Sequence, residues 1–116
     1  MHIAYLAVTI AAIAANAGMA VADFARAGFV LANSAEVGLR ASWVPPLGAL
    51  KAAGAIGLLL GLLGARPIGI AAAGGLVLFY VGAMIAHVRA RVFYNIAFPG
   101  AYLALAIGSF ALAVAH

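Results

Sequence analysis

Four long apolar stretches dominate the chain, and short segments rich in charge separate them. The stretches cover about 3–22, 46–64, 68–88 and 98–115, and Lys51 is the one Asp, Glu, Lys or Arg residue inside them. Each is close to the ~20 residues that a helix needs to cross the ~30 Å apolar core of a bilayer. The pattern therefore predicts an all-α integral membrane protein, a four-helix bundle.

The first apolar stretch also contains small-residue patterns of the kind found at signal-peptide cleavage sites, such as Ala15-Asn16-Ala17. No Lys or Arg precedes the stretch, and it is longer than the usual apolar core of a signal peptide. We therefore expect it to be a first transmembrane helix that stays part of the protein.

The segment 23–44 neither spans a membrane nor has the composition of a short loop. It interleaves apolar side chains with four of the eight charged residues, namely Asp23, Arg26, Glu36 and Arg40. Asn33 and Glu36 have the spacing of a helix-capping pair, and Glu36 and Arg40 have that of an i, i+4 ion pair. We expect a short interfacial helix over about 34–41, with Trp43 at the headgroup level before the next span.

Composition supports a membrane rather than an aqueous environment. Hydrophobic residues make up 69% of the 116 residues and charged residues only 7%, whereas soluble domains carry roughly a quarter. Mean hydropathy is +1.25. The formal charge of +4 suggests nucleic acid in a soluble protein, but the chain has no basic helix face and no aromatic platform, so we expect no nucleic-acid partner. The partner we expect is the lipid bilayer.

Small residues recur at helical spacing in the second and third spans. Gly57-xxx-Gly61 and Ala71-xxx-Gly75 are two such pairs. In lipid, small residues let helices approach closely, so both faces predict tight packing inside the bundle. The same pattern also occurs at dimer interfaces, which leaves a homo-oligomer open.

The distribution of basic residues predicts an orientation. The connections at 23–46 and 89–97 lie on one side and carry Arg26, Arg40, Arg89 and Arg91, with Lys51 just inside, whereas the other side has only Arg66. Because cytoplasmic connections carry the excess of Lys and Arg, we expect both termini to be extracytoplasmic in the cell membrane.

A family resemblance is carried by Asn95 and by two longer parts of the chain, SWVPPLGALKAAGAIGLLLGL and GLVLFYVGAMIAHVRAR. They resemble the second and third helices of the DoxX-like family of small four-helix bacterial membrane proteins. The resemblance covers nearly the whole chain and implies one domain over 1–116. Lys51 stands where many members carry an acidic residue. The family name derives from a quinone-linked oxidoreductase subunit, so the resemblance makes a quinone one ligand to consider.

Lys51 and His87 are the most unusual polar residues of the spans. Lys51 lies little more than one turn inside its helix, where a charged side chain must snorkel, pair or face a wet cavity. Gly48 and Gly54, at i−3 and i+3, place it on a small-residue face that favours an inward position. His87 ends the third span on the same membrane side, and Tyr80 lies two turns earlier on the same helix face.

A cluster on one membrane side unites the candidate site residues, which are Asp23, Arg26, Glu36, Arg40, Lys51, Tyr80, His87 and Arg89. Three interpretations remain open. The cluster is structural, or it forms a polar mouth over an apolar cavity for a lipid, quinone or other hydrophobic small molecule, or it catalyses proton transfer or quinone-linked redox chemistry with His87 as candidate catalytic residue. We expect no metal or haem, because too few ligands lie at matching depth.

Overall fold

The protein forms an all-α bundle of four long helices, as the sequence predicted. The computed structural model describes residues 2–115, so Met1 and His116 lie outside the described part. The long helices are α1 (His2–Phe24), α3 (Val44–Leu62), α4 (Arg66–Arg89) and α5 (Ala97–Ala115). All four, α3 together with the turn before it, are long and apolar enough to cross a membrane. Their bounds agree with the predicted spans to within about two residues.

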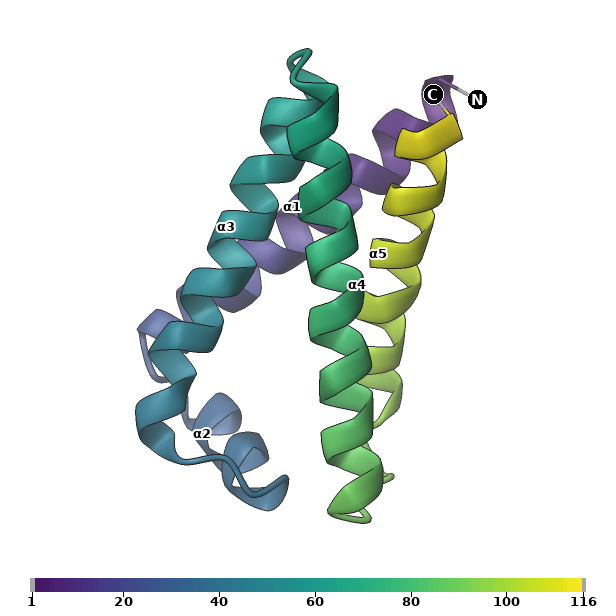
Figure 1. Ribbon diagram of the computed structural model, residues 1–116. Helices are drawn as coiled ribbons and strands as arrows, with labels where there is room; N and C mark the ends of the chain where they lie inside the picture. The colour runs from purple at the N-terminus through teal and green to yellow at the C-terminus, as the bar shows by residue number, and fades with distance from the viewer. Residues whose placement is uncertain (1, 116) are drawn as a thin grey trace.

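The four long helices pack in a ring, in which α1 and α4 each contact both α3 and α5. Figure 1 shows α1 running obliquely behind the other three helices. Both chain ends lie at the same end of the bundle as the turn between α3 and α4 (Figure 1). The opposite end, called the α2 end below, carries the short helix α2 (Gly28–Glu36) and the connection 90–96.

The segment between α1 and α3 differs from the prediction. Its helix is α2, over Gly28–Glu36, instead of a helix over 34–41, and a single 3-10 turn, η1 (Ala41–Trp43), follows it. Gly38, at φ +84°, ends the helix in the left-handed conformation that favours glycine. Asn33 therefore lies inside α2 instead of capping it. The predicted ion pair between Glu36 and Arg40 is not among the salt bridges of residues 2–115.

Close approach of α3 and α4 depends on glycine. A Cβ added to Gly61 would lie 2.6 Å from the Gly69 Cα, and one added to Gly57 would lie 2.5 Å from the Ala72 Cβ. The prediction that Gly57 and Gly61 pack inside the bundle is therefore confirmed. The prediction for the other pair, Ala71-xxx-Gly75, is wrong, because Ala71 is exposed and a Cβ at Gly75 would meet nothing within 4 Å.

The core is built mainly from small side chains, and many large apolar side chains point outward. The buried cluster consists of Ala12, Leu58, Ala73, Leu76, Tyr80 and Ala106. Leu78 is 74% exposed and Leu63 75% exposed. In water such exposure on every long helix would be costly, whereas in a bilayer these side chains contact lipid. The distribution fits a protein whose solvent is the hydrocarbon layer.

Candidate functional site

A cavity of about 350 Å³ lies at the α2 end, with walls from all four long helices, α2 and the connection 90–96. Its volume is within the range of small-molecule sites, roughly 300–1,000 Å³. Most of the lining is apolar and includes Met19, Phe29, Val30, Val44, Leu47 and Phe79. The polar lining residues are Asp23, Asn33, Ser34, Glu36, Lys51, Tyr80, His87, Tyr94, Asn95 and Tyr102.

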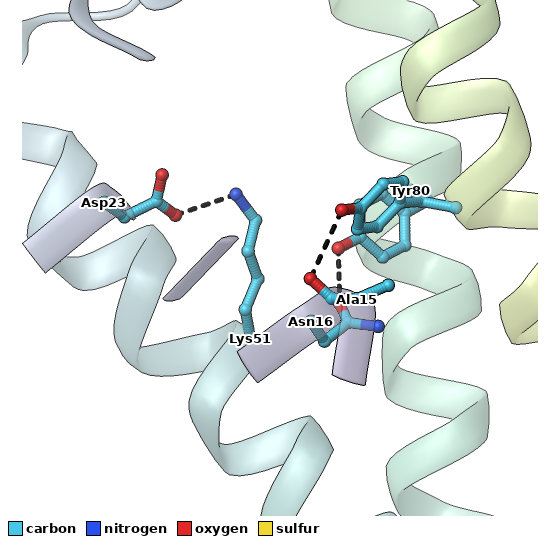
Figure 2. Close-up of polar contacts among 6 residues, drawn as sticks. Ala15, Asn16, Asp23, Lys51 and Tyr80 are labelled. Atoms are coloured by element: carbon cyan, nitrogen blue, oxygen red, sulfur yellow. Dashed lines mark hydrogen bonds and ion pairs between the residues drawn. The ribbon is translucent and has the colours of Figure 1, made fainter. Parts of the chain in front are cut away.

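The charged pair of the cavity joins α1 to α3. Lys51 Nζ donates a hydrogen bond to Asp23 Oδ2 at 2.7 Å, and the two side chains are 12% and 2% exposed. Figure 2 shows the lysine side chain reaching across to the carboxylate. A Cβ at Gly48 would lie 2.7 Å from the Asp23 Cβ, so glycine at this position lets α1 approach α3 closely enough for the pair.

The ion pair excludes snorkelling, one of the three possibilities that the sequence left open for Lys51. A snorkelling lysine would extend its ammonium group towards the aqueous surface. Instead the ammonium group is bound to a buried carboxylate and lies 5.4 Å from the centre of the Phe79 ring, at cation–π distance. Lys51 therefore faces the inside of the bundle.

A second group of hydrogen bonds joins α1 to α4 and α5 deeper in the bundle. Tyr80 donates to Asn16 Oδ1, and Asn16 Nδ2 donates to the Ala12 carbonyl at 2.8 Å. Tyr102 donates to the Ala15 carbonyl at 3.2 Å. Figure 2 shows the Tyr80 phenol directed at Asn16 of α1. Asn16, which is 1% exposed, thus satisfies its amide inside the membrane span.

His87 is a buried histidine with one unpartnered nitrogen. Its side chain is only 4% exposed, and Nδ1 lies 2.9 Å from the Ala83 carbonyl oxygen one turn earlier in α4. A carbonyl can only accept, so Nδ1 carries the hydrogen of this bond. The other nitrogen, Nε2, is buried and has no hydrogen-bond partner among residues 2–115.

At the outer side of the cavity, two hydrogen bonds fasten α2 to the connection 90–96. Asn95 Nδ2 donates to Asn33 Oδ1 at 2.9 Å, and Tyr94 Oη donates to Glu36 Oε1 at 2.6 Å. The bond to Glu36, with smaller effects of desolvation and of the carboxylate charge, raises the pKa of Tyr94 above its usual value. The phenol therefore stays protonated and donates at physiological pH.

The structure brings together some of the predicted site residues and separates others. Asp23, Glu36, Lys51, Tyr80 and His87 all line the one cavity. Arg26, Arg40 and Arg89 are exposed and do not belong to its lining. Within residues 2–115 no three His, Cys, Asp or Glu side chains are grouped so as to hold a metal ion.

Several polar residues of this region were not among the predicted site residues, and they include Asn16, Tyr94 and Tyr102. Tyr94 and Tyr102 line the cavity, and Asn16 binds Tyr80 beside it. Asn16 could have been found from the sequence, because it is one of two polar residues in the first apolar stretch and an amide in a span needs a partner. The sequence did not mark the two tyrosines as site residues, since aromatic residues near span ends also serve as interfacial anchors.

Four apolar helices of spanning length around a partly polar cavity define a multi-pass membrane protein of the four-helix class. The chain belongs to the DoxX-like family, which it matches over residues 7–109. No significant match was found among curated proteins or among solved structures.

Proposed function

We propose that this DoxX-like protein binds a hydrophobic small molecule, a lipid or a quinone, in the cavity at the α2 end. The observation that supports the proposal most is the combination of an apolar chamber of about 350 Å³ with hydrogen-bonding side chains. An apolar pocket with a few convergent polar groups is typical of ligand sites, since the apolar walls supply affinity and the polar groups fix orientation. The bilayer supplies such ligands at high local concentration.

Mass spectrometry of molecules that co-purify in mild detergent tests the proposal. The variant Ala83→Phe places a ring at a lining position, whereas Ile85→Phe adds a similar ring at an exposed position of the same helix. We expect a specific lipophilic molecule with the wild type and Ile85→Phe, and its loss with Ala83→Phe. Only bulk phospholipid, in equal amounts from all three proteins, would count against the proposal.

Catalysis is the second candidate function, and His87 favours it. A buried imidazole whose Nε2 has no hydrogen-bond partner within residues 2–115 can accept a proton from a bound substrate, as a general base must. Such an enzyme would act on a lipophilic substrate by proton transfer, or by quinone-linked redox chemistry. His87→Gln should then abolish turnover of the co-purified molecule, whereas turnover equal to the wild type would exclude the histidine.

We also propose that the whole of 1–116 is one domain and that both termini face away from the cytoplasm. In that orientation the cavity lies at the cytoplasmic end of the bundle, beside the exposed Arg26, Arg40, Arg89 and Arg91. The support is the excess of basic residues at the α2 end.

A further inference from the structure

Two buried hydrogen-bond acceptors of the cavity lack donors within the described chain. The first is His87 Nε2, which keeps its lone pair in the neutral ring because Nδ1 carries the hydrogen that binds the Ala83 carbonyl. The second is Asn95 Oδ1, because Asn95 uses its Nδ2 to bind Asn33. Both residues line the same cavity. Leaving a buried acceptor without a donor is unfavourable, so a ligand that supplies a donor gains affinity here.

The buried charges of the cavity are already matched to each other. Lys51 and Asp23 neutralise each other at 2.7 Å, and the exposed Glu36 accepts a hydrogen bond from Tyr94. An anionic head would have to displace Asp23 from Lys51, and a cationic head would have to displace Lys51 from Asp23. Beside the buried Asp23–Lys51 pair, the cavity therefore favours an uncharged head over a carboxylate, a phosphate or an amine.

From these contacts we propose that the ligand is a lipophilic alcohol, with an apolar chain against the cavity wall and a hydroxyl that donates to His87 Nε2 or Asn95 Oδ1. This inference rests on the proposed function and names the chemical class of its ligand. An ether, ketone or ester of the same shape only accepts hydrogen bonds, so it would leave both acceptors unsatisfied. A site that hydrogen-bonds a hydroxyl in this way discriminates strongly against analogues without one.

Matched pairs of alcohols and methyl ethers test the inference with the full chain in detergent. The probes are decanol, farnesol and geranylgeraniol, each with its methyl ether, and the measurement is competition against tritiated alcohol. We expect the alcohol that fits best to bind at least about tenfold more tightly than its ether, the ratio that corresponds to one hydrogen bond. In at least one of the two variants that remove an acceptor, His87→Phe and Asn95→Leu, the ratio should fall to about twofold or less. In Arg89→Gln, at an exposed site outside the lining, it should be unchanged.

The outcomes separate this inference from the proposed function. Equal binding of alcohols and ethers to the wild type would overturn the hydroxyl requirement and leave hydrophobic binding in place. Binding of no probe would overturn both. If His87→Phe does not fold, Asn95→Leu supplies the second variant, and the ratio measured on the wild type already decides whether a donor is required.

Discussion

At the scale of single residues, the least usual feature is the ion pair between Asp23 and Lys51. A charged side chain alone in the apolar layer costs several kcal/mol, and pairing with a carboxylate at 2.7 Å removes most of that cost. The ion pair also orders the wall of the cavity, since its partners come from α1 and α3. Neither residue is replaceable on its own without leaving the other charge buried.

Lys51→Met should therefore lower the midpoint of thermal unfolding in detergent. The variant leaves the Asp23 carboxylate, which is 2% exposed, without its partner, and breaking such a pair costs about 3–5 kcal/mol. Adding Asp23→Asn to Lys51→Met should recover part of the loss. Arg89→Met is the control, because Arg89 is exposed. An unchanged or higher midpoint for Lys51→Met would show that the pair does not stabilise the fold.

Arg91 is a residue in a conformation that suits glycine. It follows the end of α4 at φ +57°, and the next residue, Val92, donates its N–H to the His87 carbonyl at 2.9 Å. Arg91→Gly should relieve about 1 kcal/mol of left-handed strain and raise the unfolding midpoint by a few degrees. Arg89→Gly removes the same charge inside the helix and should lower the midpoint instead. Equal shifts for both variants would exclude strain as the cause.

At the scale of helices, the packing of α3 on α4 sets the shape of the cavity. The two helices touch through Gly57 and Gly61 near their turn. Figure 1 shows them diverging towards the α2 end, where the cavity lies between larger side chains such as Leu47 and Phe79. Because α3 and α4 are in close contact near their turn and are separated by larger side chains at the other end, the space between them opens towards the α2 end.

Gly61→Leu should force α3 and α4 apart, because even a Cβ at this position would lie 2.6 Å from the Gly69 backbone. Overpacking of this kind costs about 1–3 kcal/mol or more and should appear as a lower unfolding midpoint. Gly75→Leu is the control, a glycine inside α4 at which a Cβ meets nothing within 4 Å. If both variants melt like the wild type, the close approach of the two helices is not needed for stability.

At the scale of the whole molecule, the basic residues at the two ends of the bundle differ in their contacts. At the end with the termini, Arg66 Nη2 donates to the Val114 carbonyl at 2.8 Å and Nε to the Ala113 carbonyl at 3.4 Å. It thereby satisfies carbonyls at the end of α5, which is a structural reason for a cation at this position. The exposed arginines of the α2 end then dominate the orientation signal.

A reporter that is active only in the cytoplasm tests this orientation. Fused after Ala115, it should give no signal, whereas fused after Val92, in the connection of the α2 end, it should give a strong one. Equal expression of the two fusions, checked by immunoblot, is the control. The reverse pattern would invert the topology and place the cavity at the extracytoplasmic end.

The four spans could be predicted because apolar length alone defines a membrane helix, and Lys51 is the one charge that interrupts them. The short helix could not be placed correctly, because Asn33 and Glu36 have capping spacing although Gly38 ends the helix after them. The sequence offers two carboxylates, Asp23 and Glu36, with which Lys51 could pair. Which carboxylate it meets depends on the oblique course of α1, and no local pattern encodes that course.

The separation of 28 positions along the chain between Asp23 and Lys51 bears on how the protein is made. Asp23 leaves the ribosome before its partner Lys51, so until α3 arrives the end of α1 is most stable among the lipid headgroups. Insertion of α3 brings Lys51 to Asp23, and only then can both charged side chains reach their final depth in the membrane. The two helices are thus expected to leave the insertion machinery as a pair, and a ribosome stalled before Lys51 should hold an α1 whose final turn still lies in water.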